Sequence, residues 1–138
     1  MTPSDEMRGL IERIEAATGD DPELFWDVQR IVNPDPPTIW KNEQREVWTP
    51  EYAAYIACWH RFGDLIDAVA YTDAAITVIP DGWTLFHLGG PFNDSPCHAT
   101  VGGGNPVGLC EGTAATPALA LCAASLRAIS TMKGKIDG

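Results

Sequence analysis

Three side chains with acid–base and metal-binding chemistry share one edge of a predicted helix. His60, Asp64 and Asp67 are separated by four and then three residues, so an α-helix places them on the same side. An imidazole and two carboxylates arranged in this way could bind a metal ion or transfer protons. A solvent-exposed helix edge with a weak His–Asp pair explains the same residues without further ligands. We prefer this second interpretation, so the sequence predicts no catalytic residue and no metal site.

The cysteines offer a second possible chemistry, because a thiolate is both a nucleophile and a zinc ligand. Cys97 directly precedes His98, but neighbouring residues of a strand point to opposite faces, so this histidine cannot activate the thiol. Zinc binding by these two residues with His87 and Cys110 would require the strands to bring them together, since the sequence has no closely spaced ligand pair. We therefore expect reduced, inert thiols, and no cofactor.

A glycine-rich segment is the third candidate. Residues 101–108 read Val-Gly-Gly-Gly-Asn-Pro-Val-Gly, and their backbone amides could approach an anion or a planar ring. The segment lacks the lysine and Ser/Thr of a P-loop, and no helix follows it directly, so nucleotide hydrolysis is not indicated. A simple hairpin connection between two strands explains the same residues.

Aromatic and basic side chains elsewhere in the chain could complete a ligand site by stacking on a base or meeting a phosphate. The tryptophans at positions 40, 48 and 59 are further stacking candidates, although core packing is the preferred explanation for each of them. The predicted ligand-binding residues are Trp83, His87, His98, Gly102, Gly103, Gly104, Asn105, Arg61 and Arg127.

Four helices are predicted to position these groups. Each begins where a side-chain oxygen acceptor precedes a proline, at residues 2–3, 21–22, 49–50 and 116–117, because the acceptor caps a free amide and proline favours the first helical position. Apolar periodicity extends the helices over residues 3–18, 22–32, 50–68 and 117–130. Prolines and polar residues predict a loop over 33–48, and the tail from 133 to 138 is expected to fray.

The strand predictions fall in the second half of the chain. Residues 83–88, 97–101 and 107–110 are predicted to be antiparallel neighbours separated by glycine-rich turns. Residues 72–80 combine a helix-favouring Ala-Ala-Ile with a β-branched run, so both a helix and a strand remain open. The predicted fold class is α+β, with a small antiparallel sheet of about three strands packed with helices in an α/β/α sandwich-like arrangement.

Charge and hydropathy narrow the possible partners. The 138 residues predict one domain, and the net charge of −10 disfavours binding to a nucleic-acid polymer. The stretch from Gly82 to Leu126 contains only two formal charges, Asp94 and Glu111, so it must pack against helices, a second subunit or a ligand. No apolar run reaches the length of a membrane span and the first residues lack a secretory pattern, so we expect no membrane contact and a cytoplasmic location.

Three segments taken together carry a resemblance to a known family. Residues 10–19, 71–83 and 115–126 resemble, in this order, the phage ABA sandwich domain. The resemblance implies a small bacteriophage or prophage protein with helices enclosing an antiparallel sheet and no assigned activity, and it brings no catalytic residues. The sequence departs from the family pattern in a long insertion over residues 33–66 and in the residue after the Tyr71-Thr72 pair.

The sequence leaves three functions open, of which we expect the first. The first is a non-enzymatic phage accessory protein that sequesters a small host molecule, such as a nucleotide immune signal, within the infected cell. The second is a homo-oligomeric interaction or virion assembly module that uses the charge-poor surface. The third is a small metal-dependent hydrolase built on His60, Asp64 and Asp67.

Overall fold

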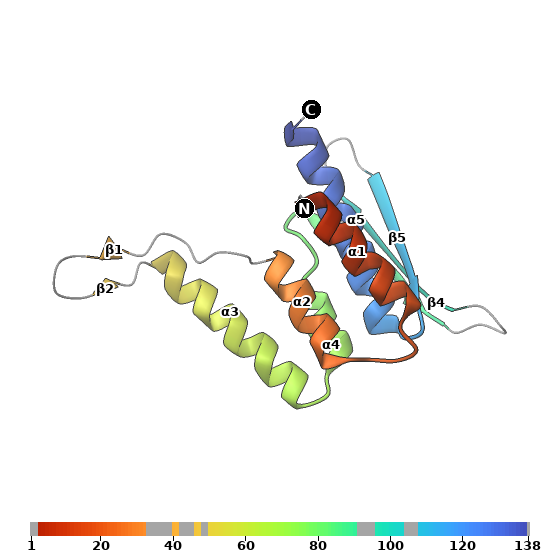
Figure 1. The fold of residues 1–138 in the computed structure, drawn as a ribbon, viewed down its shortest axis with the longest axis horizontal. Coiled ribbons are helices and arrows are strands. Elements are labelled where there is room, and N and C mark those ends of the chain that lie inside the picture. Colours follow the sequence, from red (N-terminus) through yellow and green to blue (C-terminus); the bar gives the residue numbers. More distant parts are fainter. Residues whose placement is uncertain are drawn as a thin grey trace.

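The computed structural model of this chain describes residues 3–32, 40–41, 46–47, 50–90, 96–103 and 108–137. In these residues five helices accompany a three-stranded antiparallel sheet and a short two-stranded ladder (Figure 1). The fold is therefore α+β, as the sequence predicts. The helices are α1 (Pro3–Ala16), α2 (Pro22–Val32), α3 (Pro50–Asp67), α4 (Tyr71–Thr77) and α5 (Pro117–Asp137). The strands are β1 (Trp40–Lys41), β2 (Glu46–Val47), β3 (Trp83–Gly89), β4 (Cys97–Gly103) and β5 (Gly108–Ala114).

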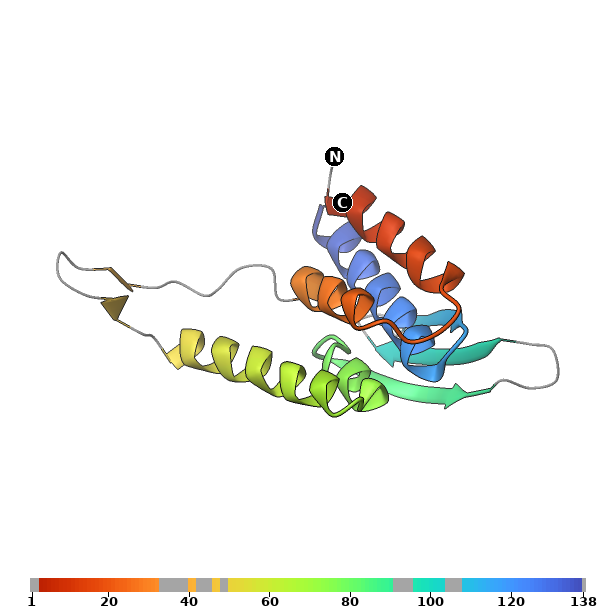
Figure 2. The same ribbon diagram turned by 60° about the horizontal axis from the view of Figure 1, so that its bottom comes forward.

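Helix α5 forms the centre of the core. It contacts all three strands of the larger sheet and also α1, α2 and α4, and Figure 2 shows it lying between α1 and the sheet. Every residue from Ala118 to Leu126 is buried. The many alanines of this run keep the helix surface flat, so the sheet approaches it closely. At Gly112 on β5 an added Cβ would collide with the backbone of Ala120 and Ala124, which explains why glycine is required there.

The sheet has one buried face and one exposed face. Strand β4 lies between β3 and β5, and its alternate residues Cys97, Ala99 and Val101 are buried beneath α5. A β-bulge interrupts the pairing of β3 with β4 between Leu85 and His87. A bulge changes the alternation of side chains, so Phe86 and His87 are both exposed on the face away from α5. We call this second face the outer sheet face.

Local hydrogen bonds confirm two of the predicted helix starts. The Thr116 hydroxyl accepts a hydrogen bond from the Leu119 amide at 3.2 Å, and the Asp21 carboxylate accepts one from the Glu23 amide at 3.0 Å. Both satisfy amides that have no partner within the first turn of a helix. The other two predicted capping residues, at positions 2 and 49, lie outside the described residues.

The structure corrects several predicted boundaries. The ambiguous segment 72–80 contains a helix, α4, whose residues Ala74 and Ala75 are buried in the core; its packing against α5 decides between helix and strand. The prediction that the tail frays from residue 133 is wrong, because α5 continues to Asp137. Strands β4 and β5 extend further than predicted, and the region predicted to be a loop over 33–48 contains the β1–β2 ladder. Helix α1 ends two residues earlier than predicted, at Ala16.

Candidate ligand-binding site

A cavity of about 770 Å³ lies where α1, β5 and the second half of α5 meet. Its apolar lining comes from Met7, Ile11 and Leu109, and its charged lining includes Arg8 and Arg127. This volume lies within the range of small-molecule sites, which combine an apolar wall with a few polar groups. The cavity is therefore the candidate ligand-binding site of the described part of the chain.

The position of the cavity follows from the sheet topology. Strand β5 is an edge strand, since it pairs only with β4 in the three-stranded sheet. An edge strand presents backbone N–H and C=O groups that no neighbouring strand binds. Helix α1 packs beside β5 and against α5, so the side chains of α1 meet these backbone groups. Leu109, Cys110 and Glu111 of β5 accordingly line the cavity.

Arg127 and Glu15 form the best-defined polar contact of the cavity. The Arg127 guanidinium donates hydrogen bonds to both carboxylate oxygens of Glu15, at 2.6 Å and 3.1 Å. It donates a third hydrogen bond, of 2.9 Å, to the backbone carbonyl of Glu111. A two-point contact of this kind fixes the orientation of both side chains as well as pairing their charges. Arg127 is thus held in place before any ligand arrives.

Glu15 also binds the edge strand itself. The Thr113 hydroxyl donates to Glu15 at 3.4 Å, and the Thr113 backbone contributes a further hydrogen bond to the same carboxylate. Burial raises the pKa of Glu15, but the hydrogen bond and charge of Arg127 and the contacts of Thr113 outweigh burial and hold the pKa below its usual range. Glu15 is therefore a carboxylate at neutral pH.

The thiols of the chain differ in their access to the cavity. All four cysteines are free. Cys110 is half-buried and lines the cavity, with its sulfur 3.9 Å from the Thr131 hydroxyl. Cys122 lies in the fully buried part of α5, where burial raises the pKa of its thiol. Cys110 is therefore the thiol through which the occupancy of the cavity can be followed.

Of the predicted ligand-binding residues that the structure describes, Arg127 alone lines the cavity. Trp83 packs against the core, whereas His87 and His98 lie on the outer sheet face. Gly102 and Gly103 belong to β4, and an added Cβ on Gly102 would collide with Phe86 and Leu109. The remaining predicted residues are Gly104 and Asn105, which lie outside the described residues, and Arg61, which is exposed on α3.

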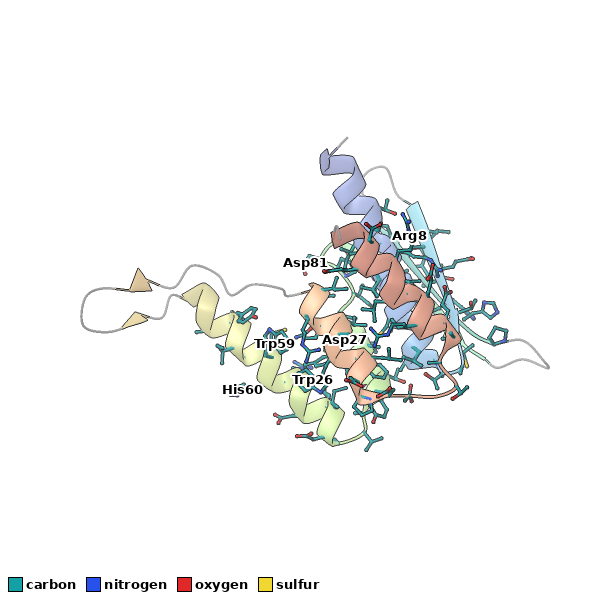
Figure 3. All side chains as sticks on the ribbon, viewed as in Figure 1. Arg8, Trp26, Asp27, Trp59, His60 and Asp81 are labelled. Carbon is teal, nitrogen blue, oxygen red and sulfur yellow. The ribbon has the colours of Figure 1, made fainter. Side chains whose placement is uncertain are left out.

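The residues weighed for metal binding and for stacking are also separated. Cys97 lies beneath α5, whereas His98 follows it on the outer sheet face, as the strand periodicity predicts. Among the described residues, no group of three or more His, Cys, Asp and Glu side chains could hold a metal ion; this includes His60, which projects from α3 away from α2 (Figure 3). Trp59 stacks on Trp26 with ring centroids 5.8 Å apart, so this tryptophan packs one helix on another.

Sequence reasoning missed most of the cavity. On α1, Arg8, Glu12 and Glu15 follow a helical stripe beside Met7 and Ile11, and Figure 3 shows Arg8 on the side of α1 that faces β5. This stripe of polar residues beside apolar ones was the signal in the sequence from which the cavity wall could have been predicted. A stripe of this kind is typical of any surface helix, so it did not distinguish a binding wall from a solvent-exposed face.

The comparisons with known proteins found no relative of this chain. No family model, no curated protein and no solved structure matches this chain. The resemblance to the phage ABA sandwich domain therefore stays a prediction. None of the helices in the described residues combines the length and apolar character needed to cross a membrane.

Proposed function

We propose that this chain is a non-enzymatic binding protein for a small organic molecule, which occupies the cavity between α1, β5 and α5. The observation that carries the proposal is the Arg127–Glu15 pair, which is held in a fixed orientation at the wall of a cavity of about 770 Å³. A polar group that is already oriented loses little conformational entropy on binding, and this favours ligand affinity.

The chemistry of the lining indicates the class of ligand. Two arginines, Arg8 and Arg127, stand against two acidic residues of α1, Glu12 and Glu15, and Glu111 contributes its backbone carbonyl. A ligand that carries only negative charge would meet these carboxylates, while a purely cationic ligand would meet the arginines. A zwitterion, or a neutral molecule with both hydrogen-bond donors and acceptors, fits both sets of charges. Met7, Ile11 and Leu109 would cover its apolar part.

The base and sugar of a nucleoside and the phosphate of a nucleotide would contact different residues of the cavity. The base and sugar of a nucleoside offer donors, acceptors and an apolar ring face, which suits the mixed lining. A phosphate would have to bind Arg8, because Arg127 is already paired with Glu15. Arg8 is exposed and makes no ion pair among the described residues. Sequestration of a nucleotide immune signal by a phage accessory protein is the most specific form of the proposal.

A ligand screen with two arginine variants tests the proposal. We expect thermal shift with nucleosides, nucleotides and amino acids to identify a ligand that raises the melting temperature of the wild-type chain. Arg8→Glu should reduce binding of a phosphorylated ligand by about tenfold or more. The matched control is Arg61→Glu, which makes the same charge change on α3, outside the cavity, and should leave binding unchanged.

Two outcomes would contradict the proposal. One is the absence of any stabilising ligand in the screen, together with the absence of a co-purified small molecule by native mass spectrometry. The other is binding that is weakened by Arg61→Glu and unaffected by Arg8→Glu. Turnover of a ligand in the presence of the protein would remove the non-enzymatic part of the proposal.

A further inference from the structure

The outer sheet face carries apolar side chains that the described residues leave uncovered. Phe86 and Leu109 are each 61% exposed, and they are two of the four large hydrophobic residues exposed in the described chain. They lie on either side of Gly102, because an added Cβ at that glycine would touch both side chains. Helices occupy the opposite side of the sheet (Figure 2). An exposed apolar cluster on a sheet face is a candidate interaction surface.

The registers place the side chains of the outer sheet face in three rows across the strands, and the outermost row consists of Gly89, His98 and Thr113. Thr100 of β4 pairs with His87 on one side and with Glu111 on the other. In the adjacent row, Gly102 pairs with Thr84 of β3 and Leu109 of β5, and the side chains of Phe86 and Leu109 both lie over this glycine. These two rows therefore centre on Thr100 and on Gly102, and Phe86 and Leu109 form an apolar cluster over Gly102.

These two rows are complementary to themselves. A two-fold axis that runs parallel to β4 above Thr100 would place β3 of one copy over β5 of the other and β4 over β4. The apolar cluster of Phe86 and Leu109 over Gly102 would then face the same cluster of the second copy. The imidazole of His87 would face the carboxylate of Glu111 of the second copy. Apolar groups meet apolar groups and a base meets an acid, twice each, as a symmetric interface requires.

We infer that two copies of this chain pack through their outer sheet faces, which gives a symmetric dimer with two stacked three-stranded sheets. Stacked sheets lie about 10 Å apart with their strands nearly aligned. The side chains of Phe86 and Leu109, which lie over Gly102, would fill the space between the two sheets. The inference concerns a different surface from the proposed ligand site, although Leu109 and Glu111 border both.

The size of the face sets the expected strength of the dimer. Seven-residue strands at about 3.3 Å per residue, three strands wide, give a footprint on the order of 300 Å² per copy. Stable complexes usually bury about 800 Å² per partner. We therefore expect a dimer that forms only at high protein concentration and that is sensitive to single substitutions, each of which occurs twice in the interface.

Sedimentation of the whole chain over a range of concentrations tests the inference. The wild-type chain should show a monomer–dimer equilibrium, and Phe86→Gln should weaken it by about a hundredfold, or tenfold for each copy. The control is Val69→Asn, which removes a hydrophobic side chain of similar exposure, 67%, from the α3–α4 connection. This control should dimerise like the wild type.

A charge exchange tests the specific pairing. His87→Glu would place two carboxylates opposite each other, and Glu111→Lys would place a cation opposite His87, so each single variant should weaken the dimer at least about tenfold. The double variant restores opposite charges and should return dimerisation to near the wild-type level. A wild-type chain that stays monomeric at about 1 mM would overturn the inference, and so would a dimer indifferent to Phe86→Gln or not restored in the double variant.

Discussion

Arg127 and Glu15, which are 112 residues apart in the sequence, join the C-terminal helix to the N-terminal helix through two hydrogen bonds at the free edge of β5. Arg127 also binds the Glu111 carbonyl, and Glu15 binds Thr113. The pair thus forms hydrogen bonds with backbone groups of β5 that could otherwise pair with a further strand. Charged side chains at a sheet edge are a recognised protection against such pairing.

The Arg127–Glu15 pair should make stability depend on pH. We expect Glu15→Gln to lower the free energy of unfolding by about 1 kcal/mol near neutral pH, a modest value because both side chains are partly exposed to water. The pKa of Glu15 in the folded chain lies below its ordinary value of 4.5. The stabilisation is therefore complete above pH 4.5 and is lost as the pH falls through the lowered pKa.

Urea unfolding of both chains at several pH values measures this difference. The control is Glu12→Gln, which removes an exposed carboxylate with no ion pair among the described residues; its effect should stay within about 0.5 kcal/mol throughout. An unchanged difference between wild type and Glu15→Gln in acid would show that the pair does not act through its charge.

Because β5 packs closely on α5, adding a single methyl group to β5 at this contact should lower the free energy of unfolding. Gly112→Ala places a Cβ against the backbone of Ala120 and Ala124, so we expect a loss of about 1–3 kcal/mol in the free energy of unfolding. The matched control on the same strand is Gly108→Ala, where an added Cβ has nothing within 4 Å. Equal stability of the two variants in urea would contradict the close packing of the strand on the helix.

The end of α3 predicts a stabilising substitution. Val69 has a φ of 60°, in the left-handed region that β-branched residues avoid, and its amide and that of Ala70 close the helix by hydrogen bonds to Ile66 and Leu65. Val69→Gly should raise the free energy of unfolding by about 1 kcal/mol, since the relieved strain exceeds the entropy lost by glycine. Ala68→Gly, one residue earlier, should lower it instead. A melting temperature that falls in both variants would contradict the prediction that the backbone of Val69 is strained.

Thiol labelling should divide the cysteines into two classes. Cys97 and Cys122 are buried, whereas Cys58 and Cys110 are half-buried, and a reagent needs access to an ionised thiol. Brief iodoacetamide treatment of the folded chain, read by peptide mass spectrometry, should modify Cys110 and Cys58 first. All four should react at similar rates in urea. Early modification of Cys122 in the folded chain would contradict the packing of α5.

Local signals in the sequence determined the helix starts and the fold class. Thr116 and Asp21 cap helices where the sequence predicts them, because a cap depends on residues one turn apart. The alternation of Cys97 and His98 between two faces is equally local. The bulge at Phe86 could not be predicted, since it depends on how β3 registers with β4.

Only the tertiary structure decided which residues form the site. Arg127 was a candidate from the sequence, but its partner Glu15 looked like any acidic residue on a surface helix, and the predicted companions Trp83, His87 and His98 lie elsewhere. The physical reason is distance along the chain. A sequence pattern reports neighbours within a turn or a strand, whereas the cavity depends on α1 and α5 meeting at a sheet edge.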